Sequence, residues 1–196
     1  MTIYRSPMFF QKNCILMFLV FLNVTAQGQD KMPSDATPHQ SIKGASRLTL
    51  GLGHTHVSQG KVDGKTKWLA LPSWTLNYDY WLSNKWAIGL QNDLILESFI
   101  IESNEKKLIE RNYPIAAVPV ALFKSGKHLT LIEGVGAEFS TGHTLAMTRL
   151  GIEYGFHLPN NWEVGTAVVW DGKWSYYNSW GLAFTLSKIW PQPVHN

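Results

Sequence analysis

Apolar and polar residues alternate along much of this chain with a period of two. Between Trp74 and Tyr80 every even position is aromatic or aliphatic, and every odd position is polar. Successive side chains point to opposite faces in a β-strand, so this segment predicts a strand with one apolar and one polar face. The same alternation recurs in one segment after another from Ser46 to Trp190. The pattern therefore predicts a domain built from strands.

Turn signals divide this region into eight segments, and we expect each of them to form one strand. The segments are Ser46–Val57, Trp68–Trp81, Lys85–Ile101, Arg111–Phe123, His128–Ser140, Thr144–His157, Trp162–Asp171 and Tyr176–Trp190. In the fourth segment Pro114 and Pro119 lack the N–H that a strand donates to its neighbour, and the faces from Pro114 to Phe123 stay unassigned. In the fifth segment Glu133 falls on the apolar face, which predicts a bulge or a position at the level of a loop.

The apolar face of these segments carries most of the bulk, including most of the nine Trp. The opposite face is set with Gly, Ser, Asn, Asp, Glu and Arg. This distribution is typical of a barrel whose outer surface meets lipid and whose lumen is polar. Each segment is longer than the roughly nine residues that a tilted strand needs to cross a bilayer. The predicted fold is therefore all-β, an eight-stranded antiparallel up-and-down transmembrane β-barrel.

The connections between the segments alternate in length. Tight turns at Ser83-Asn84, Ser125-Gly126 and Pro159–Asn161 follow the second, fourth and sixth segments, whereas Ser58–Lys67 is the longest of the other connections. With an even number of strands, all tight turns fall at the periplasmic end, together with both termini of the barrel. Tryptophans near the segment ends predict aromatic girdles at the two membrane interfaces. They are Trp68, Trp81, Trp86, Trp162, Trp170 and Trp174.

The N-terminal segment predicts export from the cytoplasm. Arg5 and Lys12 precede the apolar run Cys14–Leu22, and small residues around Ala26 form a cleavage site. These features are typical of a secretory signal peptide, and the run is much shorter than the roughly 20 apolar residues of a membrane helix. The expected organisation is a signal peptide at 1–26, a flexible periplasmic lead-in at 27–44, the barrel at 45–190 and a tail at 191–196. We expect the protein in the bacterial outer membrane after cleavage.

The net charge and the cysteine content limit the kinds of partner and covalent link that we expect. Cys14 is the only cysteine and lies in the signal peptide, so we expect neither a disulfide nor a lipid anchor. The formal charge of +3 falls to +1 when Arg5 and Lys12 are removed, which does not support binding to nucleic acid. The expected partners are outer-membrane lipids, lipopolysaccharide and, during biogenesis, the barrel-assembly machinery. We expect a monomer without a cofactor.

The pattern resembles the small outer-membrane β-barrel proteins, the group around the transmembrane domain of the OmpA-like porins. The resemblance covers Ser46 to Trp190 and rests on amphipathic hairpins, short turns and the last strand, Trp180–Trp190. A final strand with alternating apolar residues and an aromatic end looks like the signal that such proteins present to the barrel-assembly machinery. The resemblance implies class and location and transfers no functional residue.

A soluble ligand-binding barrel of the lipocalin kind is the competing fold. Such a barrel has large apolar residues inside and charges outside. Here charged residues such as Asp79 and Arg149 share the minority face with Gly and Ser, and the charged content of 16% is low for a soluble surface. We favour the membrane barrel.

The charged residues of the inner face predict a polar network in the lumen. An eight-stranded barrel is only wide enough inside for side chains to fill it, so buried charges have to pair. The predicted network consists of Arg47, Asp79, Asp93, Glu97, Glu138, Arg149, Glu153 and Glu163. It acts either as a packed plug or as the gate of a narrow pore, and we favour the plug.

Two histidines are the candidates for chemistry. His54 and His56 share one face near the outer end of the first strand, where a loop carboxylate such as Asp63 would complete a metal site. With Ser58 as nucleophile and Glu97 as the orienting acid, they would instead form a hydrolase triad, and this idea resembles the outer-membrane lipid A deacylase, an eight-stranded barrel with a lipid-facing His-Ser-Glu site.

We favour plain interface or loop-base positions for both histidines, because a third metal ligand and the deacylase motif are not visible. The predicted function is a non-enzymatic outer-membrane barrel protein with a structural or surface-interaction role. A lipid-modifying hydrolase and a narrow gated pore are the alternatives.

Overall fold

The computed structural model describes residues 41–62, 65–103 and 106–192. The predicted signal peptide at 1–26, most of the lead-in and the end of the tail lie outside the described residues, as does Asp63.

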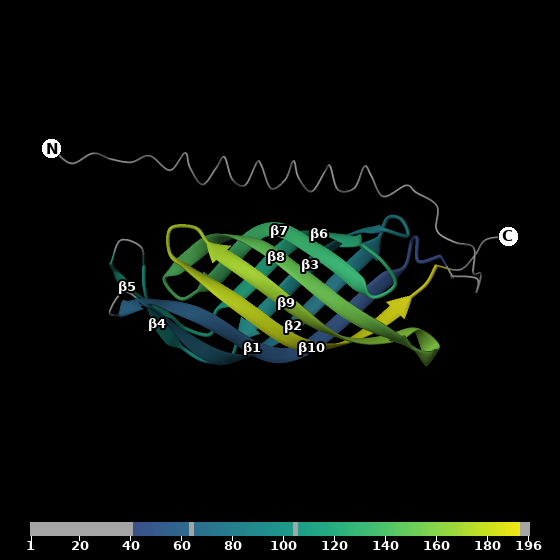
Figure 1. The fold of residues 1–196 in the computed structure, drawn as a ribbon. Coiled ribbons are helices and arrows are strands. Elements are labelled where there is room, and N and C mark those ends of the chain that lie inside the picture. Colours follow the sequence, from purple (N-terminus) through teal and green to yellow (C-terminus); the bar gives the residue numbers. More distant parts are fainter. Residues whose placement is uncertain (1–40, 63–64, 104–105, 193–196) are drawn as a thin grey trace. The chain divides into compact units, whose positions relative to one another are not determined.

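The described chain forms a closed antiparallel barrel, shown in Figure 1. The strands are β1 (Ser46–Val62), β2 (Lys65–Trp81), β3 (Trp86–Ile95), β4 (Phe99–Glu102), β5 (Leu108–Arg111), β6 (Ile115–Lys124), β7 (Leu129–Ser140), β8 (His143–Leu158), β9 (Trp162–Lys173) and β10 (Tyr177–Trp190), with the 3₁₀ turn η1 (Pro159–Asn161) before β9. Eight strands close in the order β1-β10-β9-β8-β7-β6-β3-β2, while β4 and β5 form a separate two-stranded sheet. The predicted eight-stranded antiparallel fold is confirmed.

The third predicted segment, Lys85–Ile101, is two elements instead of one strand. β3 ends at Ile95, the chain bends at 96–98, and β4 then pairs with β5 as a small hairpin. Glu97 lies in this bend and is exposed, so its predicted place in the lumen network is wrong. Glu97 keeps the parity of Gln91 and Asp93, which predicts that the strand continues, although the apolar runs Leu94–Leu96 and Phe99–Ile101 interrupt the alternation on either side of the bend.

Large apolar side chains cover the outside of the barrel. On β10 the even positions face outward, with Leu182 48% exposed and Phe184 70% exposed, whereas Thr185 and Ser187 at odd positions are buried. β6, whose faces the sequence left open, points Val118 and its even neighbours inward. The outward apolar residues include Leu48, Leu50, Leu52, Trp74, Leu76, Ile88, Leu90, Ile115, Ile152, Phe156, Val164, Val168 and Leu186.

Trp81 does not belong to the outer girdle. It is only 3% exposed and packs inside the barrel with Ala45 and Ala87, because its odd position in β2 shares the inward face of Asp79. Its predicted interfacial position is therefore wrong. The other tryptophans of the predicted girdle stay on the outward face, with Trp68, Trp162 and Trp174 exposed.

Glu133 lies in a regular part of the ladder. It pairs with Ala121 of β6 and Leu150 of β8 inside β7, so the predicted bulge or loop-level position is wrong. The irregularity among the barrel ladders is found elsewhere, between Ser58 and Lys61 in the pairing of β1 with β2.

The assignment of faces generates the first prediction. Leu182→Arg places a charge on the outward apolar face of β10 and should hinder insertion by about 2–4 kcal/mol if this position lies near the bilayer midplane. Asn178→Arg is the matched control, because Asn178 has the same facing on the same strand but lies near its end. The folded fraction in lipid vesicles, measured by gel mobility with and without boiling, separates the two variants. Equal folding of both would show that the outward face is not the lipid face.

Candidate functional site

Charged side chains inside the barrel gather in two clusters, one toward each end. We call the end with the tight turns β2–β3, β6–β7 and β8–β9 the turn end, and the opposite end the loop end. The turn-end cluster consists of Arg47, Asp79, Glu153, His157 and Glu163. The loop-end cluster consists of Asp93, Arg111, Glu138, Arg149, Asp171, Lys173 and Tyr177.

One guanidinium group organises the turn-end cluster. Arg47 donates from Nε to Asp79 Oδ2 at 2.9 Å and from Nη1 to Glu163 Oε1 at 2.9 Å. It also holds Glu153 with two parallel bonds of 2.8 Å and 3.0 Å, the bidentate geometry that makes arginine–carboxylate pairs strong. Because these partners lie on β2, β8 and β9, Arg47 links four strands across the lumen.

Further contacts extend this cluster to the turn-end mouth. His157 Nδ1 lies 2.9 Å from Glu163 Oε2, and its Nε2 lies 3.3 Å from Lys124 Nζ. The Trp81 ring lies inside the same end, with the Arg47 guanidinium carbon 5.9 Å and Lys124 Nζ 5.6 Å from its centroid. Both are cation–π contacts, in which the face of the Trp81 ring attracts the positive charges of Arg47 and Lys124.

Gly89 makes room for Asp79. A Cβ atom at this glycine would lie 2.2 Å from Asp79 Oδ1, so the carboxylate of Asp79 rests directly on the glycine of the neighbouring strand. Any larger residue there has to displace the Asp79 side chain from its place beside Arg47.

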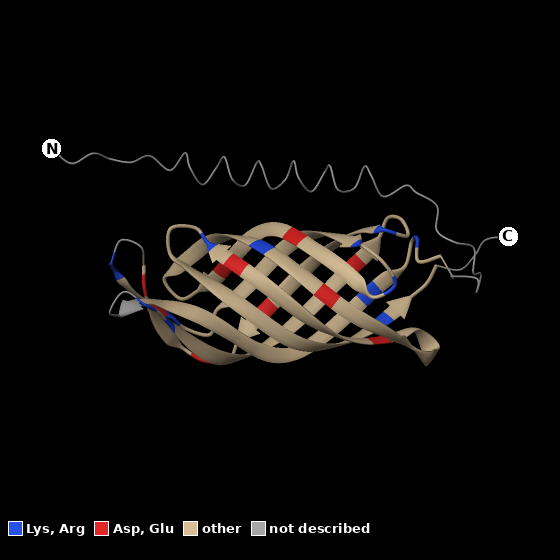
Figure 2. Ribbon diagram, viewed as in Figure 1, with Lys and Arg blue, Asp and Glu red and all other residues tan. Residues whose placement is uncertain are grey.

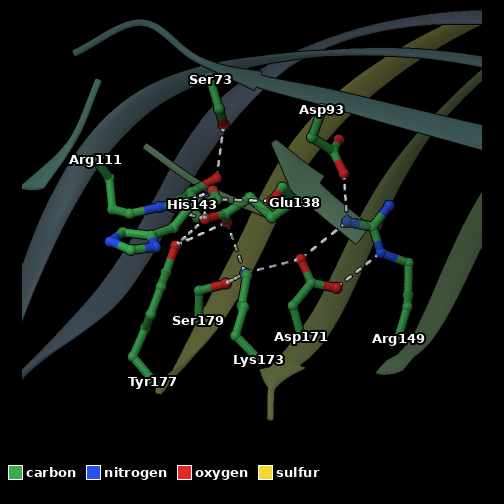
Figure 3. A network of polar contacts seen from close by, with 11 residues as sticks. Ser73, Asp93, Arg111, Glu138, His143, Arg149, Asp171, Lys173, Tyr177 and Ser179 are labelled. Carbon is green, nitrogen blue, oxygen red and sulfur yellow. Dashed lines mark hydrogen bonds and ion pairs between the residues drawn. The ribbon is translucent and has the colours of Figure 1, made fainter. Parts of the chain in front are cut away.

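The loop-end cluster is centred on Arg149, shown in Figure 3. Arg149 donates from Nε and Nη2 to the two Asp171 oxygens at 2.8 Å and 2.9 Å, and it forms an ion pair with Asp93. Lys173 Nζ lies 3.4 Å from Asp171 and 3.5 Å from Glu138, and donates to Ser179 Oγ at 2.5 Å. The lysine thus connects the Arg149 pairs with Glu138.

Glu138 is the meeting point of the remaining groups. Arg111 donates to its Oε1 from Nη2 at 2.7 Å and from Nε at 3.0 Å, and Tyr177 Oη donates at 2.6 Å. Arg111 comes from β5, so this contact fastens the small hairpin to the barrel interior. Three cations, Arg111, Arg149 and Lys173, match the three carboxylates of this cluster, as buried charges require.

Apolar side chains fill the rest of the described interior. One group covers the loop-end cluster, where Phe99 of the hairpin meets Tyr177 edge to face at 6.1 Å. It contains Val57, Leu71, Ile95, Phe99, Ile101, Leu145 and Tyr177. A second group lines the wall formed by β3, β6, β7 and β8 with Ala87, Ala116, Val118, Val120, Leu122, Ile132 and Met147. The expectation of a polar inner face therefore fails on β6, whose inward residues from Ala116 to Leu122 are all aliphatic.

A small cavity separates the two clusters. Its volume is about 40 Å³, and Asn77, Gln91, Arg149, Glu153 and Asp171 contribute to its lining. A space of this size holds about three water molecules.

The structure brings together seven of the eight residues predicted for the lumen network, Arg47, Asp79, Asp93, Glu138, Arg149, Glu153 and Glu163. Glu97 is the exception. The prediction missed Arg111, Asp171, Lys173 and Tyr177. Asp171 shares the inward parity of Glu163 on β9, so the alternation pattern held a signal for it. No such signal exists in the sequence for Arg111, because Arg111 reaches the lumen from the β4–β5 hairpin.

His54, His56 and Ser58 lie on the outward side of β1, and both imidazoles are exposed. None of the hydrogen bonds or ion pairs of the described residues involves these three side chains. Glu97 lies in the bend after β3, and no described carboxylate orients either imidazole. Within the described ranges, no group of three or more His, Cys, Asp or Glu side chains is placed to hold a metal ion.

The architecture defines a class of protein. A closed eight-stranded barrel with large apolar side chains outside and paired charges inside is a transmembrane β-barrel of the small outer-membrane type. A soluble barrel would carry these charges on its surface. The described residues contain no helix that is long and apolar enough to cross a membrane.

Comparisons with protein-family models and with curated proteins find no match. Among solved structures, the chain is similar to Ail, the attachment invasion locus protein of Yersinia pestis, which was crystallised in complex with the heparin analogue sucrose octasulfate. The two sequences are 16% identical, the match covers 74% of this chain and 99% of that chain, and the TM-score is 0.49. Neisserial surface protein A gives 10% identity, the same coverages and a TM-score of 0.47. These values are too low to carry an argument about function, which therefore rests on the barrel itself.

Gly89 provides a test of the turn-end cluster. Gly89→Ala should lower the free energy of unfolding by about 1–3 kcal/mol, because the new methyl group displaces Asp79 from Arg47. Gly126→Ala is the control, since a Cβ atom there meets no atom within 4 Å. Urea unfolding in vesicles, followed by tryptophan fluorescence, measures both. If the two variants unfold alike, Asp79 does not depend on the space above Gly89.

Proposed function

We propose that this protein is an integral barrel of the bacterial outer membrane whose lumen is closed by its own side chains, and that its role is structural or surface-interacting. The observation that carries this proposal is the pair of arginine-centred clusters. Arg47 and Arg149 each bind carboxylates from several strands, so they fasten the barrel from within.

The orientation follows from the connections. We assign the turn end to the periplasm and the loop end to the cell exterior, because the longest connection between described barrel strands, residues 96–114 with the β4–β5 hairpin, lies at the loop end, and outer-membrane barrels have short periplasmic turns and longer external loops. In this assignment residues 1–26 are a cleaved signal peptide, and 27–44 lead in from the periplasm. Lipids and lipopolysaccharide surround the barrel, the barrel-assembly machinery inserts it, and it works as a monomer.

The plug is favoured over a gated pore for an energetic reason. A continuous pathway would require Arg149 to leave Asp171 or Arg47 to leave Glu153, and each step would leave buried charges unpaired. The apolar group around Phe99 and Ile101 covers the loop-end cluster as an additional barrier. A pore would have to move the hairpin as well as break the ion pairs.

The hairpin of β4 and β5 supports a role at the surface. Its outward positions carry Leu108, which is 76% exposed, and Ile100, which is 54% exposed, while Phe99 and Arg111 on its other face are buried. Exposed apolar residues on a firmly held element are typical of a contact surface for another macromolecule.

Location is the first test of this proposal. The mature protein should fractionate with the outer membrane and migrate differently on gels before and after boiling, because a closed barrel resists unfolding in detergent at room temperature. Recovery in the soluble periplasmic fraction, with mobility independent of boiling, would contradict the proposal.

Arg149 distinguishes the plug from the pore. Arg149→Met should lower the free energy of unfolding by about 3–5 kcal/mol, because Asp93 and Asp171 lose their shared partner. Lys127→Met in an exposed turn is the control and should change stability by less than about 0.5 kcal/mol. Planar bilayers should show no conductance for the unaltered protein. Steady conductance together with unchanged stability of Arg149→Met would favour the gated pore.

The hydrolase alternative has one observation in its favour, since His54, His56 and Ser58 share the outward face of β1. Neighbours on one face of a strand lie about 6.5–7 Å apart, beyond the roughly 2.6–3.2 Å of a base and its nucleophile. We therefore expect purified protein to release no acyl chains from lipid A or phospholipid. Acyl release that disappears in both His56→Ala and Ser58→Ala would establish an enzyme.

A further inference from the structure

Lysines surround the turn end of the barrel. Lys43 precedes β1, Lys85 lies in the turn between β2 and β3, Lys127 lies in the turn between β6 and β7, and Lys188 lies near the end of β10. Figure 2 shows blue segments gathered at this end, where the described chain begins and ends. Because the closed strand order places these elements around the circumference, the four lysines form a rim, which we call the basic rim.

The basic rim has no exposed carboxylate among the described residues. Asp79, Glu153 and Glu163 are buried in the lumen against Arg47, and Glu133, on the outward face of β7, is half-buried. The charge of the three lumen carboxylates is thus shared with a cation, whereas the side chains of Lys43, Lys85 and Lys127 are exposed. The fully exposed charges of the basic rim are therefore all positive among the described residues.

The loop end differs in its balance of charge. It also carries four exposed lysines, Lys65, Lys67, Lys106 and Lys107, but Glu97, Glu102 and Glu110 accompany them. Lysine alone therefore does not distinguish the two ends. The difference is that the loop end has exposed acidic residues, Glu97 and Glu110, beside its lysines, whereas no described carboxylate of the turn end is exposed.

Lys188 shows at which level the rim lies. It occupies an outward position on β10, its Nζ lies 5.0 Å from the centroid of the Trp162 ring, and it donates to Asn160 O at 2.6 Å. Tryptophan concentrates where lipid headgroups meet the hydrocarbon, and lysine extends its ammonium group to that level while its carbons stay beside apolar residues. Lys188 thus places a cation at the depth of lipid phosphates.

We propose that the basic rim binds the headgroups of anionic phospholipids in the leaflet at the turn end. This inference rests on the membrane insertion given under the proposed function. Its chemistry is the attraction of lysine ammonium groups to lipid phosphates, each of which contributes when it lies within a Debye length of an anionic surface. A ring around the circumference at interfacial depth matches a surrounding leaflet better than it matches a single acidic chain.

The test measures lipid retained by the folded barrel. Protein in detergent is titrated with phosphatidylglycerol or phosphatidylcholine, and native mass spectrometry counts the bound lipids. The rim variant combines Lys43→Gln, Lys85→Gln, Lys127→Gln and Lys188→Gln. The matched control combines Lys65→Gln, Lys67→Gln, Lys106→Gln and Lys107→Gln, and so removes the same charge from the other end. Boiling-dependent gel mobility confirms beforehand that each variant is a folded barrel, which keeps this test separate from that of membrane insertion.

The unaltered protein and the loop-end control should retain several-fold more phosphatidylglycerol than phosphatidylcholine, and the rim variant should lose this preference. An unchanged preference in the rim variant, or an equal loss in both variants, would overturn the proposal. A different partner would also overturn the proposal. This would be the outcome if the rim variant kept its lipid preference but, unlike the unaltered protein and the loop-end control, no longer sedimented with isolated peptidoglycan. If the rim variant does not fold, Lys43→Glu with Lys127→Glu replaces it, since neither side chain takes part in a hydrogen bond or ion pair of the described residues.

Discussion

The narrow lumen of an eight-stranded barrel governs the rest of this structure. The interior has room for side chains but little for water, so a charge that enters it has to meet an opposite charge at hydrogen-bonding distance. Arg47 meets this condition with Asp79, Glu153 and Glu163, although Glu163 lies 116 residues further along the chain. A strand shifted by one residue would turn such a side chain toward lipid, so the ion pairs also select the register of the ladder.

The interior is divided between two kinds of packing. Ion pairs occupy the side of β1, β8 and β9, while the inward residues of β6 from Ala116 to Leu122 are all aliphatic. The apolar wall is packed like the core of a soluble protein, and it leaves the guanidinium groups of Arg47 and Arg149 with fewer directions in which to point. The apolar side chains thus help to hold the two arginines in the geometry of their ion pairs.

Most of the fold could be predicted because lipid and lumen impose opposite demands on neighbouring residues. The pattern failed where that contrast was weak. Both faces of β6 are apolar, so its facing could not be assigned, and Glu97 kept the inward parity although the barrel strand had already ended. Arg111 could not be predicted as a lumen residue, because its position depends on the hairpin folding back into the barrel. For Trp81 the parity that it shares with Asp79 indicates the inward position, whereas its residue type favours the interface.

The attachment of the hairpin through Arg111 has a consequence for how this protein can change over time. The base of the hairpin is held from inside by Glu138 and by the packing of Phe99, while Lys106 and Lys107 at its far end lie outside these contacts. Substitutions or short insertions at that far end leave the ion pairs of the lumen and the ladder of the barrel strands in place. The sequence at the end of the hairpin can thus vary at little cost to the stability of the barrel, and in the proposed orientation this variable segment lies on the cell exterior.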